Sequence, residues 1–355
     1  MKCRKCSFEN IKENKFCSNC GAEIYPVPFY KKHPIKLVLS LISIFFFILF
    51  FYSFISFINQ IGNDLSLTQK SQGYISGKGE NKIAVINIDG IIVETFESDG
   101  ISSLSDNYTS AREIKRILEE IRNDNSVKAL ILRINSPGGS AAASDEILSE
   151  IRRYKSDTNL PIIAYMSDVA ASGGYYVAMG ADKIVANPAT ITGSIGVIIS
   201  YLSFKELANK YGVKQIVYKS GELKNLADSF STPTAQETQV LQSIIDEMYK
   251  TFIKVVAEGR KLEESYVQEI ADGRVYSANQ AIKLKLIDEI GNFENSISTA
   301  KKLANLQDAS VFEYGKKSLL DEILKINLSK LGIINFDQNL VSQLRKPSIM
   351  YLTNF

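Results

Sequence analysis

Apolar and polar positions follow two different periods along the middle of the chain. Unbroken apolar runs are typical of strands buried on both faces, and they predict strands at residues 82–88, 127–134, 161–166, 183–186 and 213–218. Apolar residues three and four positions apart predict helices at 111–121, 145–154 and 235–259, and shorter ones near 262–271, 277–285 and 293–304. A helix of small residues is expected from Gly173. Because strands and helices alternate, we expect an α/β domain with a largely parallel sheet over residues 81–305.

A long apolar segment precedes this domain. Residues 37–58 contain no charged side chain, and at 1.5 Å per residue such a helix crosses a hydrocarbon core of about 30 Å. We therefore predict a transmembrane helix at 35–58, between linkers at 25–34 and 59–80. A cleaved signal peptide fits poorly, because cysteines precede the segment and no small-residue cleavage site follows it.

Charge on the two flanks predicts the orientation. Residues 1–36 hold eight lysines and arginines, whereas residues 59–80 hold only Lys70 and Lys78. Positive flanks stay in the cytoplasm. We expect a single-pass protein of the cell membrane, with its N-terminus cytoplasmic and its large domain outside.

Composition narrows the chemistry. The 355 residues carry a net charge of +2, which gives no electrostatic reason to expect nucleic-acid binding. The one histidine is His33, and all four cysteines lie within the first twenty residues. A Ser-His-Asp triad or a cysteine nucleophile is therefore excluded in a domain that lies outside the membrane.

The cysteines form a spacing of their own, C-x2-C-x10-C-x2-C. Two such pairs supply four thiolates, the set that Zn²⁺ binds tetrahedrally in structural sites. We predict a zinc ribbon over residues 1–24, with a structural or docking role because no ligand position stays open. Two disulfides are the alternative, and they would need an oxidising compartment. The four ligands are Cys3, Cys6, Cys17 and Cys20.

Two motifs follow predicted strands and could carry catalysis. Residues 135–140 (NSPGGS) end in glycines whose N–H groups could stabilise an oxyanion, although a plain strand-to-helix turn is the simpler interpretation. Ser172 stands among small residues before a predicted helix, where it could be an exposed nucleophile or only a helix N-cap. The N–H of Gly173 would be a second oxyanion donor. Without a histidine, a buried lysine is the plausible base for a serine, which predicts a Ser/Lys dyad.

Six motifs in order resemble the signal peptide peptidase A family of membrane-bound serine proteases over residues 81–305. They are Asn135–Ser140, Ala170–Tyr176, Ala181–Ala186, Thr192–Val197, Lys219–Lys224 and Asp272–Tyr276. The resemblance implies Ser172 as nucleophile and Lys224 as general base, in preference to Lys219. It implies that Ser194 orients the lysine amine. The N–H groups of Gly139 and Gly173 would form the oxyanion hole, with Gly138 as the alternative to Gly139, and a structural role is expected for Gly273–Tyr276.

The resemblance also implies a crotonase/Clp protease-like fold and a homo-octameric ring in which serine and lysine come from adjacent subunits. The implied substrates are remnant signal peptides with small or apolar residues near the cleaved bond. The zinc ribbon departs from the family pattern and points to a cytoplasmic partner or a regulatory role.

Two other functions fit the sequence less well. An acyl-CoA enzyme of the crotonase type is disfavoured by the predicted external location, and a non-catalytic membrane scaffold by the presence of Ser172, Lys224 and Ser194 together. In the C-terminal tail at 306–355, the last residues, 342–355, are hypothesised to lie near the active-site groove as a self-ligand.

Overall fold

The computed structural model describes residues 1–11, 14–24, 45–53, 72–95, 108–315 and 348–352. The chain divides into two compact units, residues 1–69 and residues 70–355. In the first unit, isolated β-bridges join Lys2 to Glu9 and Phe16 to Glu23 around the cysteines.

Residues 45–53 of the first unit are helical, and the large apolar side chains from Phe45 to Tyr52 are all exposed. Within the described ranges, no helix is both long and apolar enough to cross a membrane. Most of the span predicted at 35–58, and the whole linker predicted at 25–34, lie outside the described residues.

Among the described residues, the second unit is built on one mixed sheet of twelve strands. The strands are β1 (Gln72–Gly77), β2 (Lys82–Val93), β3 (Tyr108–Ser110), β4 (Val127–Ser140), β5 (Ile162–Ala171), β6 (Lys183–Ala186), β7 (Ile191–Gly193), β8 (Ile198–Ser200), β9 (Val275–Ser277), β10 (Glu289–Ile290), β11 (Ser310–Tyr314) and β12 (Ser348–Leu352). Along the main path the order is β1-β11-β2-β4-β5-β6-β10, and every neighbouring pair from β11 to β10 is parallel. The α/β class is thus confirmed.

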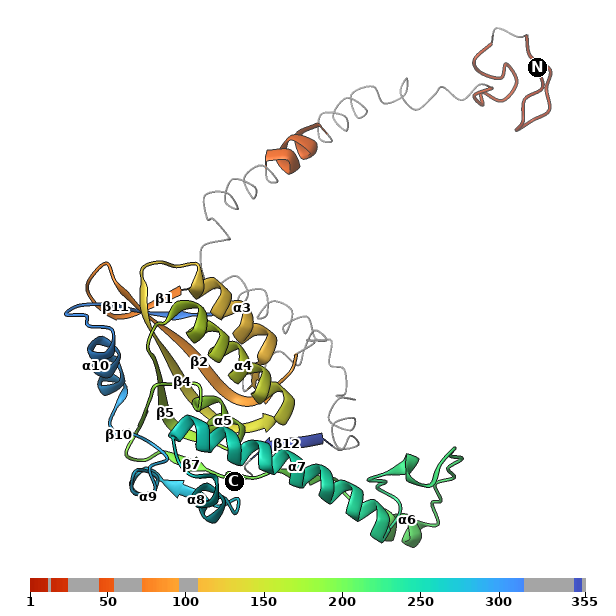
Figure 1. Ribbon diagram of the computed structural model, residues 1–355. Coiled ribbons are helices and arrows are strands. Elements are labelled where there is room, and N and C mark those ends of the chain that lie inside the picture. Colours follow the sequence, from red (N-terminus) through yellow and green to blue (C-terminus); the bar gives the residue numbers. More distant parts are fainter. Residues whose placement is uncertain (12–13, 25–44, 54–71, 96–107, 316–347, 353–355) are drawn as a thin grey trace. The chain divides into compact units, whose positions relative to one another are not determined.

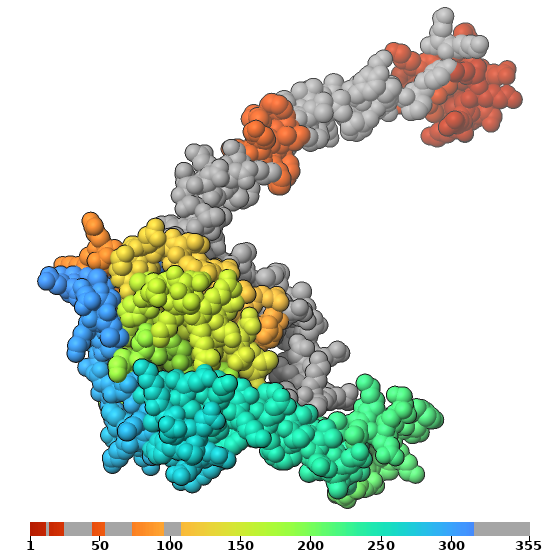
Figure 2. Space-filling model, viewed as in Figure 1, coloured from red at the N-terminus to blue at the C-terminus, as the bar shows by residue number. Residues whose placement is uncertain are grey.

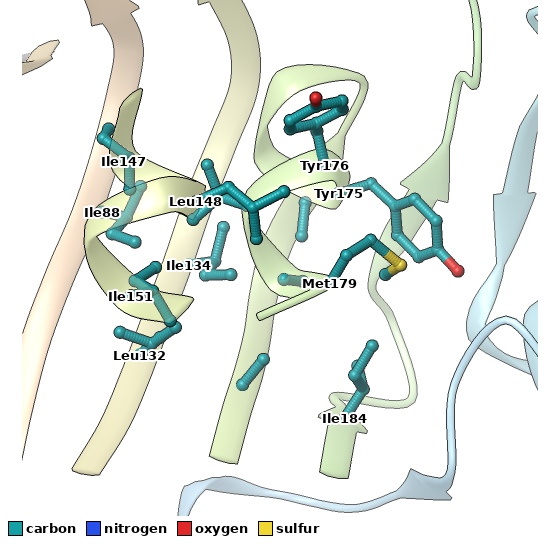
Figure 3. Close-up of a cluster of buried hydrophobic side chains, with 14 of the residues drawn as sticks. Ile88, Leu132, Ile134, Ile147, Leu148, Ile151, Tyr175, Tyr176, Met179 and Ile184 are labelled. Atoms are coloured by element: carbon teal, nitrogen blue, oxygen red, sulfur yellow. The ribbon is translucent and has the colours of Figure 1, made fainter. Parts of the chain in front are cut away.

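Helices cover both faces of this sheet (Figure 1). They are α3 (Ala111–Arg122), α4 (Ala141–Thr158), α5 (Gly173–Ala178), α6 (Lys205–Tyr211), α7 (Ala235–Arg260), α8 (Glu264–Ile270), α9 (Ala278–Lys283) and α10 (Phe293–Leu303), with a short 3-10 helix at Glu222–Asn225. On one face, Ile88 lies next to Ile147 and Leu132 lies next to Ile151 of α4, in a cluster that also includes Tyr176 of α5 (Figure 3). On the other face, α10 covers a smaller cluster through Ile297 and Ala300.

Most elements extend beyond their predicted bounds. Strand β4 continues through the whole Asn135–Ser140 motif, which was expected to be a turn. Strands β1, β11 and β12 lie within the predicted linker and tail, so the sheet includes residues outside 81–305.

The strand predicted at 213–218 is wrong. These residues have no regular secondary structure, and no pairing of the sheet among the described residues includes them. The apolar side chains that suggested a buried strand are instead exposed, to 75% for Ile216 and 95% for Tyr218.

Candidate active site

Ser172 occupies a strained turn between β5 and α5. Its backbone has φ 51° and ψ −116°, outside the regions that residues with a side chain usually adopt. The turn is held by the Ser172 N–H, which donates to the Gly193 carbonyl at 2.8 Å, and by the Tyr176 N–H, which donates to the Ser172 carbonyl at 2.8 Å. A strained serine at a strand–helix junction is the geometry of a nucleophile elbow.

The hydroxyl of Ser172 is buried and unpaired. The residue is 1% exposed, and its Oγ has no hydrogen-bond partner among the described residues. Ser172 stands at the N-cap position of α5, but its side chain makes no capping bond. The simple N-cap interpretation therefore does not account for this serine.

Two glycines bring the backbone of β4 against the start of α5. A Cβ on Gly173 would lie 2.5 Å from the Ser144 Oγ and 3.2 Å from the Gly139 nitrogen. A Cβ on Gly139 would lie 2.1 Å from the carbonyl oxygen of Ile92. Neither position has room for a side chain, and the two backbones lie side by side next to Ser172. The first N–H groups of a helix have no partner within it, so Gly173 can donate to an oxyanion.

Ser194 lies beside this turn. It follows β7, whose Gly193 pairs with Ala171, and it is a non-glycine residue at φ 50° with 8% of its surface exposed. Its N–H donates to the Arg274 carbonyl at 2.8 Å. The structure thus brings Ser172, Gly173, Gly139 and Ser194 into one region.

The Asp272–Tyr276 motif packs against the segment that carries Ser194. Strand β9 pairs antiparallel with β7, and the ring of Tyr276 packs where a side chain on Gly193 would stand. The side chains of Asp272 and Arg274 form an ion pair, and hydrogen bonds from Arg274 lower the pKa of Asp272 to about 2. These contacts agree with the structural role expected for Gly273–Tyr276.

Lys224 is not brought to Ser172 within one chain. It lies exposed in the 3-10 helix, in an arm that we define as residues 201–234. The arm adjoins the N-terminal end of α7 through a hollow lined by Lys219, Asn225 and Glu237. Helix α7 meets α5 where the rings of Phe252 and Tyr176 pack at 5.1 Å. From Ala235 to Phe252 the helix rises about 26 Å.

The same separation applies to Lys219, whose Nζ donates to the Glu222 carbonyl at 2.6 Å within the arm. In Figure 2 the arm (green) projects from the rest of the unit at the far end of α7. Eight of its large apolar side chains are exposed, and they belong to Leu202, Leu207, Tyr211, Val213, Ile216, Val217, Tyr218 and Phe230. An exposed apolar patch of this kind is typical of a protein–protein interface.

The C-terminal strand β12 lies on the glycine motif. Its residues Met350–Leu352 pair antiparallel with Gly138–Ser140 of β4, and Ser348–Met350 pair with Ile198–Ser200 of β8. The path between β4 and β8 therefore accepts an extended peptide backbone. The sequence did not predict strand β8, which pairs with β12 on the side opposite β4. Three residues without a clear alternation of apolar and polar side chains are too few to indicate a strand.

The four cysteines of the first unit form a compact cluster. Their sulfur atoms all lie within 4.8 Å of one another, and no disulfide joins them. Although burial raises it, hydrogen bonds from Asn10 and from backbone N–H groups lower the pKa of Cys17 to about 6. The cluster can hold a metal ion, and the alternative of two disulfides is not supported.

Comparison with known proteins identifies relatives of this chain. Residues 154–307 match the sequence profile of peptidase family S49. A protein of Enterococcus faecium described as a signal peptide peptidase SppA is 40% identical over 238 residues, 67% of this chain and 68% of that protein. A protein of Methanocaldococcus jannaschii described as a protease is 33% identical over 264 residues, 74% of this chain and 84% of that protein. Protease 4 of Haemophilus influenzae is 38% identical over 244 residues, 68% of this chain but only 38% of its own.

Two solved structures are also similar. A ClpP1 mutant from Listeria monocytogenes shares 17% identity and covers 60% of this chain and 94% of its own, with a TM-score of 0.39. A mutant of the membrane-bound stomatin-specific protease 1510-N shares 18% identity over 63% of this chain and 86% of its own, also with a TM-score of 0.39.

The family match and the sequence relatives identify the chain as a serine peptidase. The chain belongs to peptidase family S49, the family of the signal peptide peptidases, and the resemblance seen in its motifs is confirmed.

Proposed function

We propose that this protein is a membrane-anchored serine endopeptidase that degrades remnant signal peptides, with Ser172 as nucleophile and Lys224 as general base. The observation that carries the proposal is the strained turn at Ser172, whose buried hydroxyl has no partner among the described residues. An unsatisfied buried hydroxyl destabilises a fold by about 1–3 kcal/mol. A reacting hydroxyl that must stay free for a base and a substrate accounts for that arrangement.

The chemistry follows from the groups at the site. A neutral Lys224 amine takes the Ser172 proton as Oγ attacks the peptide carbonyl, and the N–H groups of Gly139 and Gly173 stabilise the oxyanion. Collapse of this intermediate breaks the C–N bond, and the proton from Lys224 passes to the leaving amine. Water then hydrolyses the acyl-enzyme with Lys224 as base again. The Lys224 amine donates a hydrogen bond to the Ser194 hydroxyl, which orients the amine.

This dyad needs two copies of the chain. The rise along α7 keeps the arm that carries Lys224 about 26 Å from the contact of α7 with α5, which follows Ser172 directly. The exposed apolar residues of the arm give it a surface to bury against a neighbour. We propose a ring of eight copies, as the family resemblance implies, in which each arm carries its lysine to the serine of the next copy.

The substrate binds as an added strand between β4 and β8. Support comes from β12, which occupies this path by backbone pairing with Gly138–Ser140 and Ile198–Ser200. Main-chain pairing recognises any extended peptide and leaves sequence preference to side-chain pockets. In this proposal the tail is a self-ligand, so a chain that ends before residue 348 should cleave peptides at least as fast as the full chain. A slower truncated chain with an unchanged fold would argue against it.

Membrane anchoring is proposed from residues 35–58, with the N-terminus in the cytoplasm. The charge-free run and the all-round exposure of Phe45–Tyr52 support it. An anchored peptidase meets signal peptides where they are released, at the membrane.

Zn²⁺ is the metal proposed for the cysteine cluster. The Sγ atoms of Cys3 and Cys20 are 3.7 Å apart and those of Cys6 and Cys17 are 3.4 Å apart. A tetrahedron with zinc–sulfur bonds of about 2.3 Å has edges of about 3.8 Å, so the four sulfurs fit. Bound there, the ion would supply folding energy to a segment too small to bury a core.

The test uses the full chain in detergent with a synthetic signal peptide as substrate. Wild type should cleave it, Ser172→Ala and Lys224→Ala should not, and sizing should give the same oligomer for all three. Cleavage that survives Ser172→Ala would refute the assigned nucleophile. An intact oligomer of wild type without cleavage of any peptide would favour the non-catalytic scaffold.

A further inference from the structure

Ser136 is a buried serine in the glycine motif to which the proposed chemistry assigns no role. It is fully buried in β4, one residue past an irregularity in the pairing with β5, where it pairs with Ala170. Its Oγ donates to the Gly90 carbonyl at 2.6 Å and accepts from the Gly138 N–H at 3.1 Å. A carbonyl can only accept and an N–H can only donate, so both partners fix the hydroxyl in one orientation.

Ser136 contacts three segments, two of them through its hydroxyl. Gly90 lies in β2 at φ 68°, where the pairing of β2 with β4 is irregular. Gly138 belongs to the end of β4. On the third side, a Cβ on Gly174 would lie 2.7 Å from the Ser136 carbonyl oxygen and 3.3 Å from its Cβ, so the first turn of α5 packs directly on Ser136.

The bond to Ser136 also decides between the two glycines that could donate to the oxyanion. The Gly138 N–H already has a buried acceptor in Ser136, and residue 137 is a proline, which has no N–H. Gly139 is the next donor along the strand. Its nitrogen lies 3.2 Å from the place where a Cβ of Gly173 would stand, so it neighbours the second donor.

We propose that Ser136 is a positioning residue for the oxyanion hole. Its hydroxyl binds the Gly138 N–H and anchors the end of β4 to Gly90, which aims the Gly139 N–H at the reacting carbonyl. Ser136 does not touch substrate, and it acts only through Gly138 and Gly139. The proposal rests on the proposed peptidase function.

The experiment compares Ser136→Ala with Ser296→Ala in the full-length oligomer. Ser296 is an equally buried serine in α10, on the other face of the sheet, and its hydroxyl donates to the Phe293 carbonyl at 2.6 Å. Removing an oxyanion donor lowers kcat by about 10²–10³. In Ser136→Ala the Gly139 N–H would remain but would be displaced from the oxyanion. This should lower kcat by about tenfold to a hundredfold, with KM within about twofold of wild type.

The affinity for a peptide aldehyde is a second measurement, and it should not change if Ser136 has only a structural role. Its adduct with the serine places an oxyanion in the hole, so Ser136→Ala should weaken its binding by the factor lost in kcat. The pH profile should stay unchanged, because the base is untouched. Ser296→Ala should lower the melting temperature without either effect. Ser136→Cys keeps the side-chain shape with a weaker hydrogen bond, and it should fall between wild type and alanine.

Unchanged kcat in a folded Ser136→Ala oligomer would overturn the proposal, as would an equal loss in Ser296→Ala or unaltered aldehyde affinity. If Ser136→Ala does not assemble, Ser136→Cys decides by the same measurements. Wild type and Ser172→Ala run beside them. Absence of hydrolysis by wild type, or hydrolysis by Ser172→Ala, would refute the proposed function itself, whereas normal hydrolysis by Ser136 variants refutes only the role of Ser136.

Discussion

Mixing two inactive variants tests whether serine and lysine come from different copies. Ser172→Ala keeps the lysine, and Lys224→Ala keeps the serine. The N-terminal end of α7, which the arm adjoins, lies about 26 Å along the helix from the contact of Phe252 with Tyr176 of α5, so we expect that a chain cannot complete its own dyad. In a head-to-tail ring, a site is restored where the serine of a Lys224→Ala copy meets the lysine of a Ser172→Ala copy.

The size of the effect follows from counting such contacts. With random assembly of equal amounts, both partners at a site are functional in about one quarter of sites, so about one quarter of wild-type activity should return. The two variants would be coexpressed with different tags, purified through both tags in detergent, and assayed on a fluorogenic signal peptide. Coexpression of Ser172→Ala with the double variant is the control, and it should have no activity.

Residual activity near zero in verified mixed oligomers would refute the reasoning, because it would mean that each site takes both groups from one chain. Activity of either variant alone would refute it in another way, since a dyad member would then be dispensable.

Three further predictions concern other parts of the molecule. Gly139→Ala should lower kcat by about 10²–10³, because its Cβ would stand 2.1 Å from the Ile92 carbonyl oxygen and displace the donor N–H; full activity on the peptide substrate would contradict this. Asp288→Asn should destabilise the domain by about 2 kcal/mol in denaturant unfolding, because the carboxylate accepts a hydrogen bond from the Arg260 guanidinium at 2.8 Å. Despite burial, which raises it, the bond from Arg260 lowers the pKa of Asp288. The lowered pKa makes this contribution complete above the ordinary value of 3.8 and progressively lost at lower pH, so wild type and Asp288→Asn should converge in acid. A strong chelator should release about one zinc per chain, measured colorimetrically, and leave peptide hydrolysis unchanged because the cysteines lie in the other unit; loss of hydrolysis would link the ribbon to catalysis.

Local pattern was enough to predict the central parallel strands β2, β4, β5 and β6 and the strand–helix junction at Ser172. Continuous apolar runs mark the parallel strands because both faces of β2, β4 and β5 are covered. The missing histidine directed attention to a serine with a lysine. The strand predicted at 213–218 is wrong for a physical reason. These apolar side chains have the composition of a buried strand, but they are exposed in the arm.

Contacts between distant parts of the chain could not be predicted in the same way. Nothing in the sequence near Ser136 distinguishes it from Ser140 in the same motif, and only the fold brings Gly90 to its hydroxyl. Likewise, the pairing of residues 350–352 with Gly138–Ser140 joins segments more than two hundred residues apart. The separation of Lys224 from Ser172 also emerges only from the length and placement of α7.

Covalent labelling of the nucleophile would identify the reacting residue itself. The full-length protein would be treated with a fluorophosphonate, digested, and mapped by mass spectrometry. We expect one adduct per chain on Ser172, loss of peptide hydrolysis in proportion to labelling, and no adduct in Ser172→Ala. An adduct on another residue that tracks the loss of hydrolysis, or hydrolysis that persists in fully labelled protein, would contradict it.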